Sequence, residues 1–144
     1  MLKRTISALL AAVLMITVLI PFAEELGISL PAGKTVSFGQ NLYWVPEEMP
    51  DIQRLKVMRP GLELGTVKKD RFEPAHALAL WLKDCNNVQR YPADSEEIKA
   101  YIHGDVVPST VKGWCLVCAG DYSIGWGKGD GRVLKNHYPK GLRR

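Results

Sequence analysis

The chain has 144 residues, of which 47% are hydrophobic and 24% are charged, and its formal net charge is +4. This length suits one domain of ordinary size, and the composition excludes general disorder, collagen-like repeats and a coiled coil. Three cysteines cannot supply a disulfide framework, so the sequence favours a reducing compartment and we expect a cytoplasmic protein.

The basic excess is confined to two segments. Residues 128–144 hold six basic side chains against one acidic side chain, a net charge of +5, and residues 54–71 hold six against two, a net charge of +4. If folding brings the two segments together, they form a patch that attracts phosphate. The alternative is a solvated surface that only keeps the chain soluble, and charge alone favours it.

The first element along the chain is an apolar run over residues 6–23, preceded by Lys3 and Arg4. This order resembles a signal peptide, and the run reaches the lower limit for a membrane span. Pro21 makes a poor cleavage site, so an uncleaved anchor that associates with a membrane, a buried core helix and an atypical start of the reading frame remain open. We place a domain boundary after residue 25 and expect removal of residues 1–25 to leave a folded, more soluble domain.

Short strand candidates follow this run. Residues 38–45, 55–58 and 62–67 have the apolar, aromatic and β-branched content of strands. Pro46 closes the first of them, and Pro60-Gly61 is a turn dipeptide between the other two. The pattern therefore predicts three strands in this part of the chain.

Two helices are predicted next. Pro74 fits the first turn of a helix over residues 75–82, because its missing N–H is not needed there, and the apolar composition predicts that this helix is largely buried. A second helix is predicted over residues 95–103. Asp94 can cap its start and Gly104 can end it.

The C-terminal part has the pattern of a hairpin, with strands over residues 114–119 and 122–126 joined by Gly120-Asp121. Glycines then alternate from residue 125 to residue 131. Such a stretch is either a bulged barrel corner or a place where another backbone approaches. Short strands with two helices between them predict an α+β fold built on a small barrel.

Motifs for catalysis, metal binding or cofactor binding are weak. Cys115 and Cys118 form a C-x-x-C motif, but residues three apart on a strand point to opposite faces, so we predict buried structural cysteines and no metal site. The alternating glycines are not followed by a helix that could hold a phosphate. The chain also has no hydrolase or zinc-protease motif, so we expect it not to be an enzyme.

Basic and aromatic residues form the remaining candidate site. Lysine and arginine bind phosphates, Asn136 can donate and accept hydrogen bonds, and His137 or Tyr138 could stack on a base. A histidine in an apolar helix, such as His76, is more often structural than a ligand. The alternative for Tyr138 is a place in the core. The candidate RNA-binding residues are Lys68, Lys69, Arg71, His76, Lys128, Lys135, Asn136, His137, Tyr138, Lys140 and Arg143.

Two long stretches carry a family resemblance. Residues 60–80 form one, and residues 113–114, 125–128 and 134–143 together form the other. Both, in this order, closely resemble the C-terminal region of RsmF-type ribosomal RNA cytosine-5 methyltransferases, of the NOL/NOP/Sun family. The resemblance covers about residues 34–144. It implies that residues 26–144 form an α+β, PUA-like mixed β-barrel with two short helices, a module that in this family binds RNA and follows a methyltransferase domain.

The resemblance does not extend to catalysis. The family's catalytic domain uses S-adenosylmethionine and two cysteines, one of which follows a proline, and no cysteine of this chain follows a proline. We therefore expect no cofactor, no methyl transfer by this chain, and a module that binds ribosomal RNA and works with a separate methyltransferase domain. The alternative is a membrane-anchored or exported PUA-like domain whose basic face binds anionic lipid or a protein partner.

Overall fold

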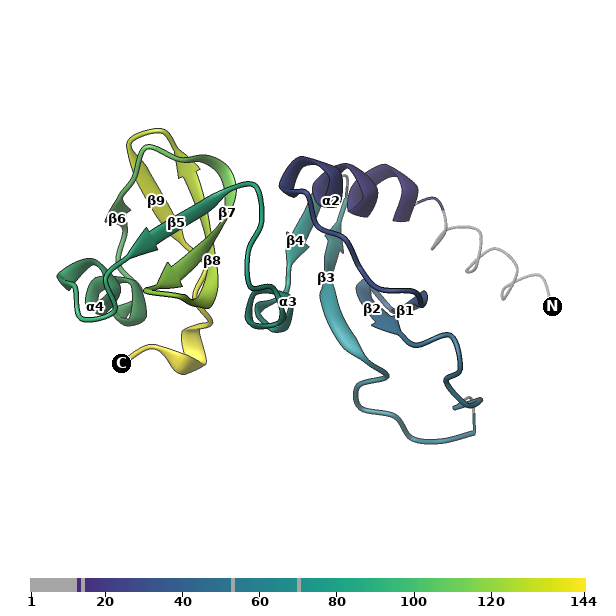
Figure 1. Ribbon diagram of the computed structural model, residues 1–144. Coiled ribbons are helices and arrows are strands. Elements are labelled where there is room, and N and C mark those ends of the chain that lie inside the picture. The colour runs from purple at the N-terminus through teal and green to yellow at the C-terminus, as the bar shows by residue number, and fades with distance from the viewer. Residues whose placement is uncertain (1–12, 14, 53, 70) are drawn as a thin grey trace. The chain divides into compact units, whose positions relative to one another are not determined.

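The computed structural model describes residues 13, 15–52, 54–69 and 71–144 (Figure 1). The chain divides into two compact units, residues 1–78 and 79–144. The division therefore falls after Leu78, whereas the sequence places a boundary after residue 25. Most of the first half of the apolar run, residues 6–12 and 14, lies outside the described residues. Among the helices that are described, none is long and apolar enough to cross a membrane.

The first unit contains a four-stranded antiparallel sheet in the order β1-β2-β3-β4. Its strands are β1 (Lys34–Phe38), β2 (Asn41–Val45), β3 (Leu62–Lys68) and β4 (Arg71–Pro74). The strand predicted over residues 62–67 is confirmed. The strand predicted over residues 38–45 is confirmed from residue 41 to residue 45 as β2, but its predicted start is wrong, because Gly39 adopts a φ of 60° and turns the chain between β1 and β2.

The strand predicted over residues 55–58 is also wrong. This segment lies in the connection between β2 and β3 and forms no strand. Leu55 is 65% exposed and Met58 is 91% exposed, so these apolar side chains have no sheet to pack against. Composition alone therefore overstated the strand content, because a strand also needs a neighbour with which to form hydrogen bonds.

The described part of the apolar run forms a short π-helix, η1 (Met15–Leu19), which continues into the α-helix α2 (Ile20–Leu26). Gly27 ends α2 in the left-handed conformation with a φ of 63°. Val18, Leu19, Phe22 and Leu26 are buried. The rings of Phe22 and Phe72 lie 4.9 Å apart, which places α2 against β4. This part of the run is thus a core helix of the first unit. Because these side chains are buried, we expect removal of residues 1–25 to destabilise the first unit rather than to leave a folded, more soluble domain.

The helix predicted over residues 75–82 is present as α3 (His76–Trp81). Pro74 is not in its first turn but ends β4, at the edge of the sheet, where a missing N–H is tolerated. Leu78 and Ala79 are buried, whereas Leu80 and Trp81 are exposed. The prediction that this helix is largely buried is therefore correct for one face only.

The second unit contains a mixed five-stranded sheet in the order β5-β7-β8-β9-β6, in which β5 runs parallel to β7 and the other pairs are antiparallel. The strands are β5 (Val88–Tyr91), β6 (Val107–Pro108), β7 (Lys112–Ala119), β8 (Tyr122–Asp130) and β9 (Val133–Asn136). The sheet curls into a half-barrel (Figure 1). The predicted hairpin at Gly120-Asp121 is confirmed as the β7–β8 connection, and the predicted α+β class is confirmed with it.

The predicted helix over residues 95–103 is α4 (Glu96–His103). Its cap is Ser95 rather than Asp94, because the Ser95 hydroxyl accepts a hydrogen bond from the Ile98 amide. Gly104 ends the helix with a φ of 107°, as predicted. The described residues thus form three α-helices, α2, α3 and α4, where the sequence predicted two, and a short 3-10 turn, η2 (Lys140–Leu142), follows β9.

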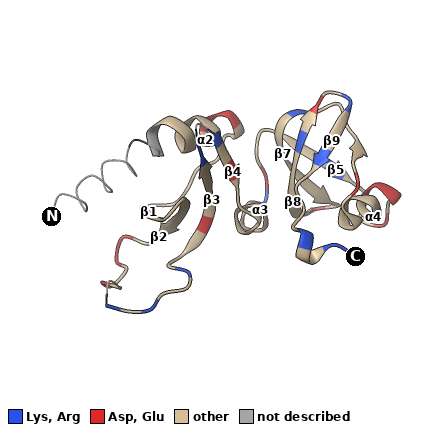
Figure 2. Cartoon of the chain, turned by 180° about the vertical axis from the view of Figure 1, so that it is seen from behind, with Lys and Arg blue, Asp and Glu red and all other residues tan. Residues whose placement is uncertain are grey.

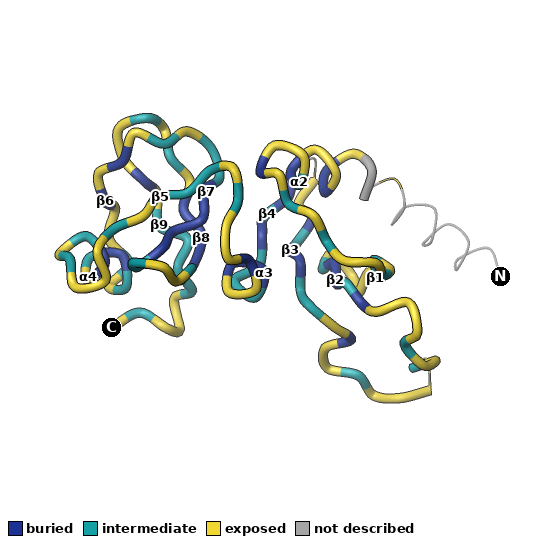
Figure 3. The backbone as a smooth tube through the Cα atoms, in the orientation of Figure 1, coloured by how far each residue is buried: buried dark blue, intermediate teal, exposed yellow. Residues whose placement is uncertain are grey.

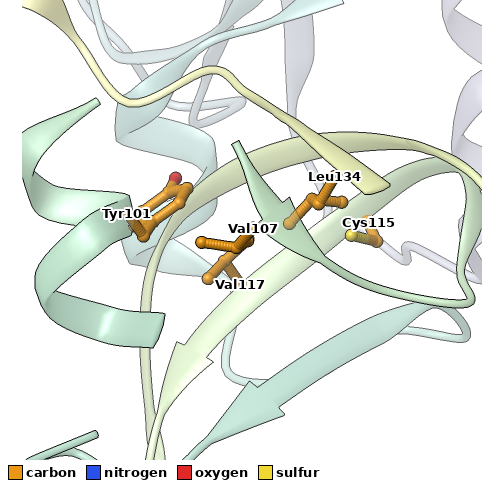
Figure 4. Close-up of a cluster of buried hydrophobic side chains, with 5 residues drawn as sticks. All are labelled: Tyr101, Val107, Cys115, Val117 and Leu134. Atoms are coloured by element: carbon orange, nitrogen blue, oxygen red, sulfur yellow. The ribbon is translucent and has the colours of Figure 1, made fainter. Parts of the chain in front are cut away.

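The core of the second unit lies between α4 and the curled sheet. Tyr101, Val107, Cys115, Val117 and Leu134 are buried there and pack together (Figure 4), and the middle residues of the central strands β7 and β8 are buried (Figure 3). Burial raises the pKa of the Cys115 thiol to about 12. The prediction that Cys115 and Cys118 are buried is confirmed.

The alternating glycines of β8 are places of close approach. The predicted approach of another backbone is confirmed at Gly129, which meets the Val111 carbonyl, whereas side chains approach Gly125 and Gly127. A Cβ at Gly125 would overlap the Tyr101 hydroxyl, and a Cβ at Gly127 would lie 2.6 Å from the Leu134 side chain. The Tyr101 hydroxyl needs this space because it donates a 2.8 Å hydrogen bond to the Trp126 carbonyl. The glycines therefore let α4 and β9 pack directly against the backbone of β8.

Candidate nucleic-acid interface

Three neighbouring strands of the second unit bring cations and an aromatic ring into one row. Strand pairing sets Trp114 of β7 opposite Lys128 of β8, and Lys128 opposite Lys135 of β9. Residues that are paired across a sheet point to the same face. Lys128 and Lys135 are both exposed, and Figure 2 shows basic residues in β9 and in the C-terminal segment. The row therefore presents two ammonium groups beside an indole.

His137 completes this group. Its ring centroid lies 4.5 Å from that of Trp114 at an interplanar angle of 60°, and the Lys128 Nζ atom lies 5.3 Å from the Trp114 centroid. Trp126, which is buried, meets Trp114 edge-on at 6.5 Å. We call the side chains of Trp114, Lys128, Lys135 and His137 the Trp114 cluster. It combines aromatic surface with positive charge, the two features with which proteins bind bases and phosphates.

Trp114 is absent from the site residues that the sequence predicts. The dipeptide Gly113-Trp114 contributes to the family resemblance, but only as part of a motif. The signal that could have found Trp114 is its place on a strand that pairs with the one carrying Lys128, since the predicted hairpin brings these strands together. The exact partner of Trp114, however, depends on a register shift between Val117 and Cys118.

Asn136 holds the fold together in this structure. Its amide nitrogen donates to the carbonyls of Tyr101 and Asp105, at 2.7 and 2.9 Å, and its oxygen accepts from the Tyr138 amide at 2.8 Å. These bonds tie β9 to the end of α4 and to the segment that follows it. Because they already use both functional groups of the side chain, we do not place Asn136 among the groups that contact a ligand.

Replacing Asn136 by alanine is expected to lower the free energy of unfolding of the second unit by about 2 to 3 kcal/mol, because two carbonyls lose their partner. Thermal denaturation followed by circular dichroism measures this change. Lys135→Ala, an exposed substitution on the same strand, is the matched control and should change the unfolding free energy by no more than about 0.5 kcal/mol. An Asn136→Ala variant as stable as the control would contradict this structural role.

Tyr138 and Arg143 attach the C-terminal segment to α4. The rings of Tyr138 and Tyr101 lie 5.3 Å apart at the edge of the core, and the Arg143 Nε atom donates to the Tyr138 carbonyl at 3.2 Å. A side chain at Gly104 would meet Arg143 at 2.6 Å, so the arginine stem lies directly on the end of α4. The structure thus favours the core alternative for Tyr138. Lys140, at the start of η2, is exposed.

The other predicted residues belong to the first unit. Lys68, Lys69 and Arg71 are exposed where β3 turns into β4, and Lys68 forms a 2.7 Å ion pair with Glu73. His76, the first residue of α3, is partly buried, and this burial lowers its pKa, so its imidazole is neutral at physiological pH. The prediction that the two basic segments form one patch stays a prediction.

Comparison with protein-family models gives two matches. The RsmF rRNA methyltransferase first C-terminal domain matches residues 21–82, and the methyltransferase RsmF PUA domain matches residues 88–144. The first match begins within α2 and ends just after α3, and the second spans the curled sheet and α4. Both models describe C-terminal parts of the methyltransferase. Since the two matches together span most of the sequence, this chain belongs to the RsmF-type ribosomal RNA methyltransferase family and contains its first C-terminal domain and its PUA domain.

Proposed function

We propose that this chain is a non-catalytic module that binds ribosomal RNA and serves a cytosine-5 methyltransferase domain. The observation that carries the proposal is the Trp114 cluster, in which two exposed lysines and two aromatic rings share one face of the PUA sheet. The family supports the choice of ligand, because both matched domains come from ribosomal RNA methyltransferases. A reducing, cytoplasmic location fits a chain with three free thiols.

The cysteines support a role without catalysis. A cysteine that attacks a base must be accessible and must react as the thiolate. Cys115 and Cys118 are buried, and burial raises the pKa of both thiols. Burial also raises the pKa of Cys85, whose thiol donates to the Asn87 carbonyl at 3.2 Å. All three thiols therefore stay protonated at neutral pH, and we expect no methyl transfer from S-adenosylmethionine to RNA by this chain alone.

RNA binding should depend steeply on salt, and the basic face should set that dependence. Changing Lys128, Lys135 and Lys140 together to alanine is expected to weaken binding and to lower the slope of log K against log salt by about 2, or about 0.7 for each phosphate that the variant no longer neutralises. Fluorescence anisotropy with a labelled ribosomal RNA fragment, titrated at several salt concentrations, measures both effects.

The control removes the same charge outside the two basic segments, by changing the exposed Lys34, Lys83 and Lys99 to alanine. A separate variant that changes Lys68, Lys69 and Arg71 to alanine tests whether the first unit also contacts the RNA. If it does, the slope of log K against log salt should fall for this variant too. The proposal fails if the wild-type chain binds RNA no better than an unrelated protein of equal charge. It also fails if the Lys128, Lys135 and Lys140 variant keeps the wild-type slope.

A further inference from the structure

Two like charges face each other directly in the Trp114 cluster. Lys128 and Lys135 are paired residues of adjacent antiparallel strands, and both are exposed. Like charges at directly opposed positions destabilise a strand pair. The Trp114 ring offsets part of this repulsion, since the Lys128 ammonium lies 5.3 Å from its centroid. An anion bound between the two ammonium groups would neutralise the repulsion that remains. The pair of lysines is therefore suited to bind a phosphate.

An aromatic surface lies immediately beside this pair. Trp114 is half-buried, and its indole is fixed by the His137 ring at 4.5 Å and by the edge of Trp126 at 6.5 Å. A ring held on two sides loses little conformational entropy when a planar ligand packs on its exposed part. Stacking of a nucleobase on such a ring contributes substantially to binding and tolerates any base, because every base has a π face.

We propose that the Trp114 cluster is a subsite for an unpaired nucleotide, in which the base stacks on Trp114 and His137 while Lys128 and Lys135 bind the adjoining phosphate. This inference rests on the proposed function and adds that the module selects single-stranded RNA. Bases within a duplex are already stacked on both faces and present only their edges and the backbone. The cluster therefore distinguishes an exposed loop or bulge from a continuous helix.

The experiment uses the full chain and three probes: a ten-nucleotide single-stranded RNA of mixed sequence, the same strand with one abasic position, and the corresponding duplex. Wild type should bind the intact single strand more tightly than the other two. Trp114→Leu should weaken binding of the single strand about tenfold or more without changing the slope of log K against log salt. This variant should also bind the intact strand and the abasic strand with equal affinity. Trp114→Phe, which keeps an aromatic ring, should lose less affinity.

Two controls isolate the cluster. Tyr122→Leu removes an aromatic ring of the same unit that is 79% exposed and lies outside the cluster, so it should leave affinity unchanged. Melting curves report whether each variant folds, because Trp114 also contacts Trp126. If Trp114→Leu does not fold, Trp114→Phe and His137→Leu test the subsite instead. Each should weaken binding of the single strand and reduce the difference in affinity between the intact and abasic strands.

The possible failures are distinguishable. If wild type binds none of the RNA probes, the proposed function falls and this inference falls with it. If wild type binds RNA but folded Trp114 and His137 variants bind all three probes as wild type does, only the nucleotide subsite is overturned. Binding of phosphatidylglycerol vesicles that disappears on changing Lys128 and Lys135, with no binding of RNA, would assign the lysine pair to a lipid surface and overturn both.

Discussion

Replacing Phe22 by alanine should lower the free energy of unfolding of the first unit by about 3 to 5 kcal/mol. Phe22 is only 7% exposed, and its ring lies 4.9 Å from that of Phe72. It also borders a small apolar space that Leu19, Leu64 and Leu78 help to line, so truncation would enlarge an existing void. Urea denaturation, followed by a probe in the first unit such as Trp44 fluorescence, measures the loss of stability.

Ile20 provides the matched control, since it lies on the same helix but is 41% exposed. Ile20→Ala should change the unfolding free energy by less than about 1 kcal/mol. By the same reasoning, removal of residues 1–25 takes away Val18, Leu19 and Phe22 and should abolish the cooperative transition of the first unit. A truncated chain that melts cooperatively at the wild-type temperature would restore the domain boundary expected from the sequence.

Replacing Gly129 by alanine should destabilise the second unit by about 3 kcal/mol. An added Cβ would overlap the carbonyl carbon and oxygen of Val111, and backbone atoms cannot rotate away as the end of a flexible side chain can. The Val111 carbonyl is also fixed, because it accepts a 3.0 Å hydrogen bond from the Gly131 amide. The expected result is a large fall in the melting temperature of the second unit, measured by calorimetry.

Gly141→Ala is the control for this prediction. A Cβ at Gly141 would meet nothing within 4 Å, so the substitution should be close to neutral. If Gly129→Ala were as stable as Gly141→Ala, the close approach between β8 and the segment before β7 would be refuted. The comparison thus separates a steric effect from the general effect of replacing glycine in a folded chain.

Local patterns in the sequence identified the elements whose signals lie within a few residues. The hairpin at Gly120-Asp121 and the helix that ends at Gly104 appear where the sequence predicts them. Both depend on backbone conformations that particular residues favour, and these preferences act whatever the rest of the chain does. The family was also evident from the sequence, because two long motifs occur in order, and the matches to residues 21–82 and 88–144 confirm it.

Other features depend on partners that are distant in the chain. The apolar run over residues 6–23 has the composition of a membrane anchor, but the burial of its side chains and the contact of Phe22 with Phe72 show that its described part is a core helix. Asn136 looks like a ligand-binding amide in the sequence, but its hydrogen bond to the Tyr101 carbonyl, 35 residues away, makes it a tie between β9 and α4. Composition cannot distinguish these roles, because the same side chain serves either one.

The candidate site itself was decided by the tertiary structure. A regular hairpin closed by Ala119 and Tyr122 would set Trp114 opposite Gly127, but a register shift between Val117 and Cys118 sets it opposite Lys128. Since side chains alternate faces along a strand, a shift of one residue determines whether the lysine and the indole share a face. The sequence by itself determined the family, the hairpin and the basic residues of this protein. Only the packing of the whole sheet decided the shift, because the energy of a bulge depends on what both faces of the strand contact.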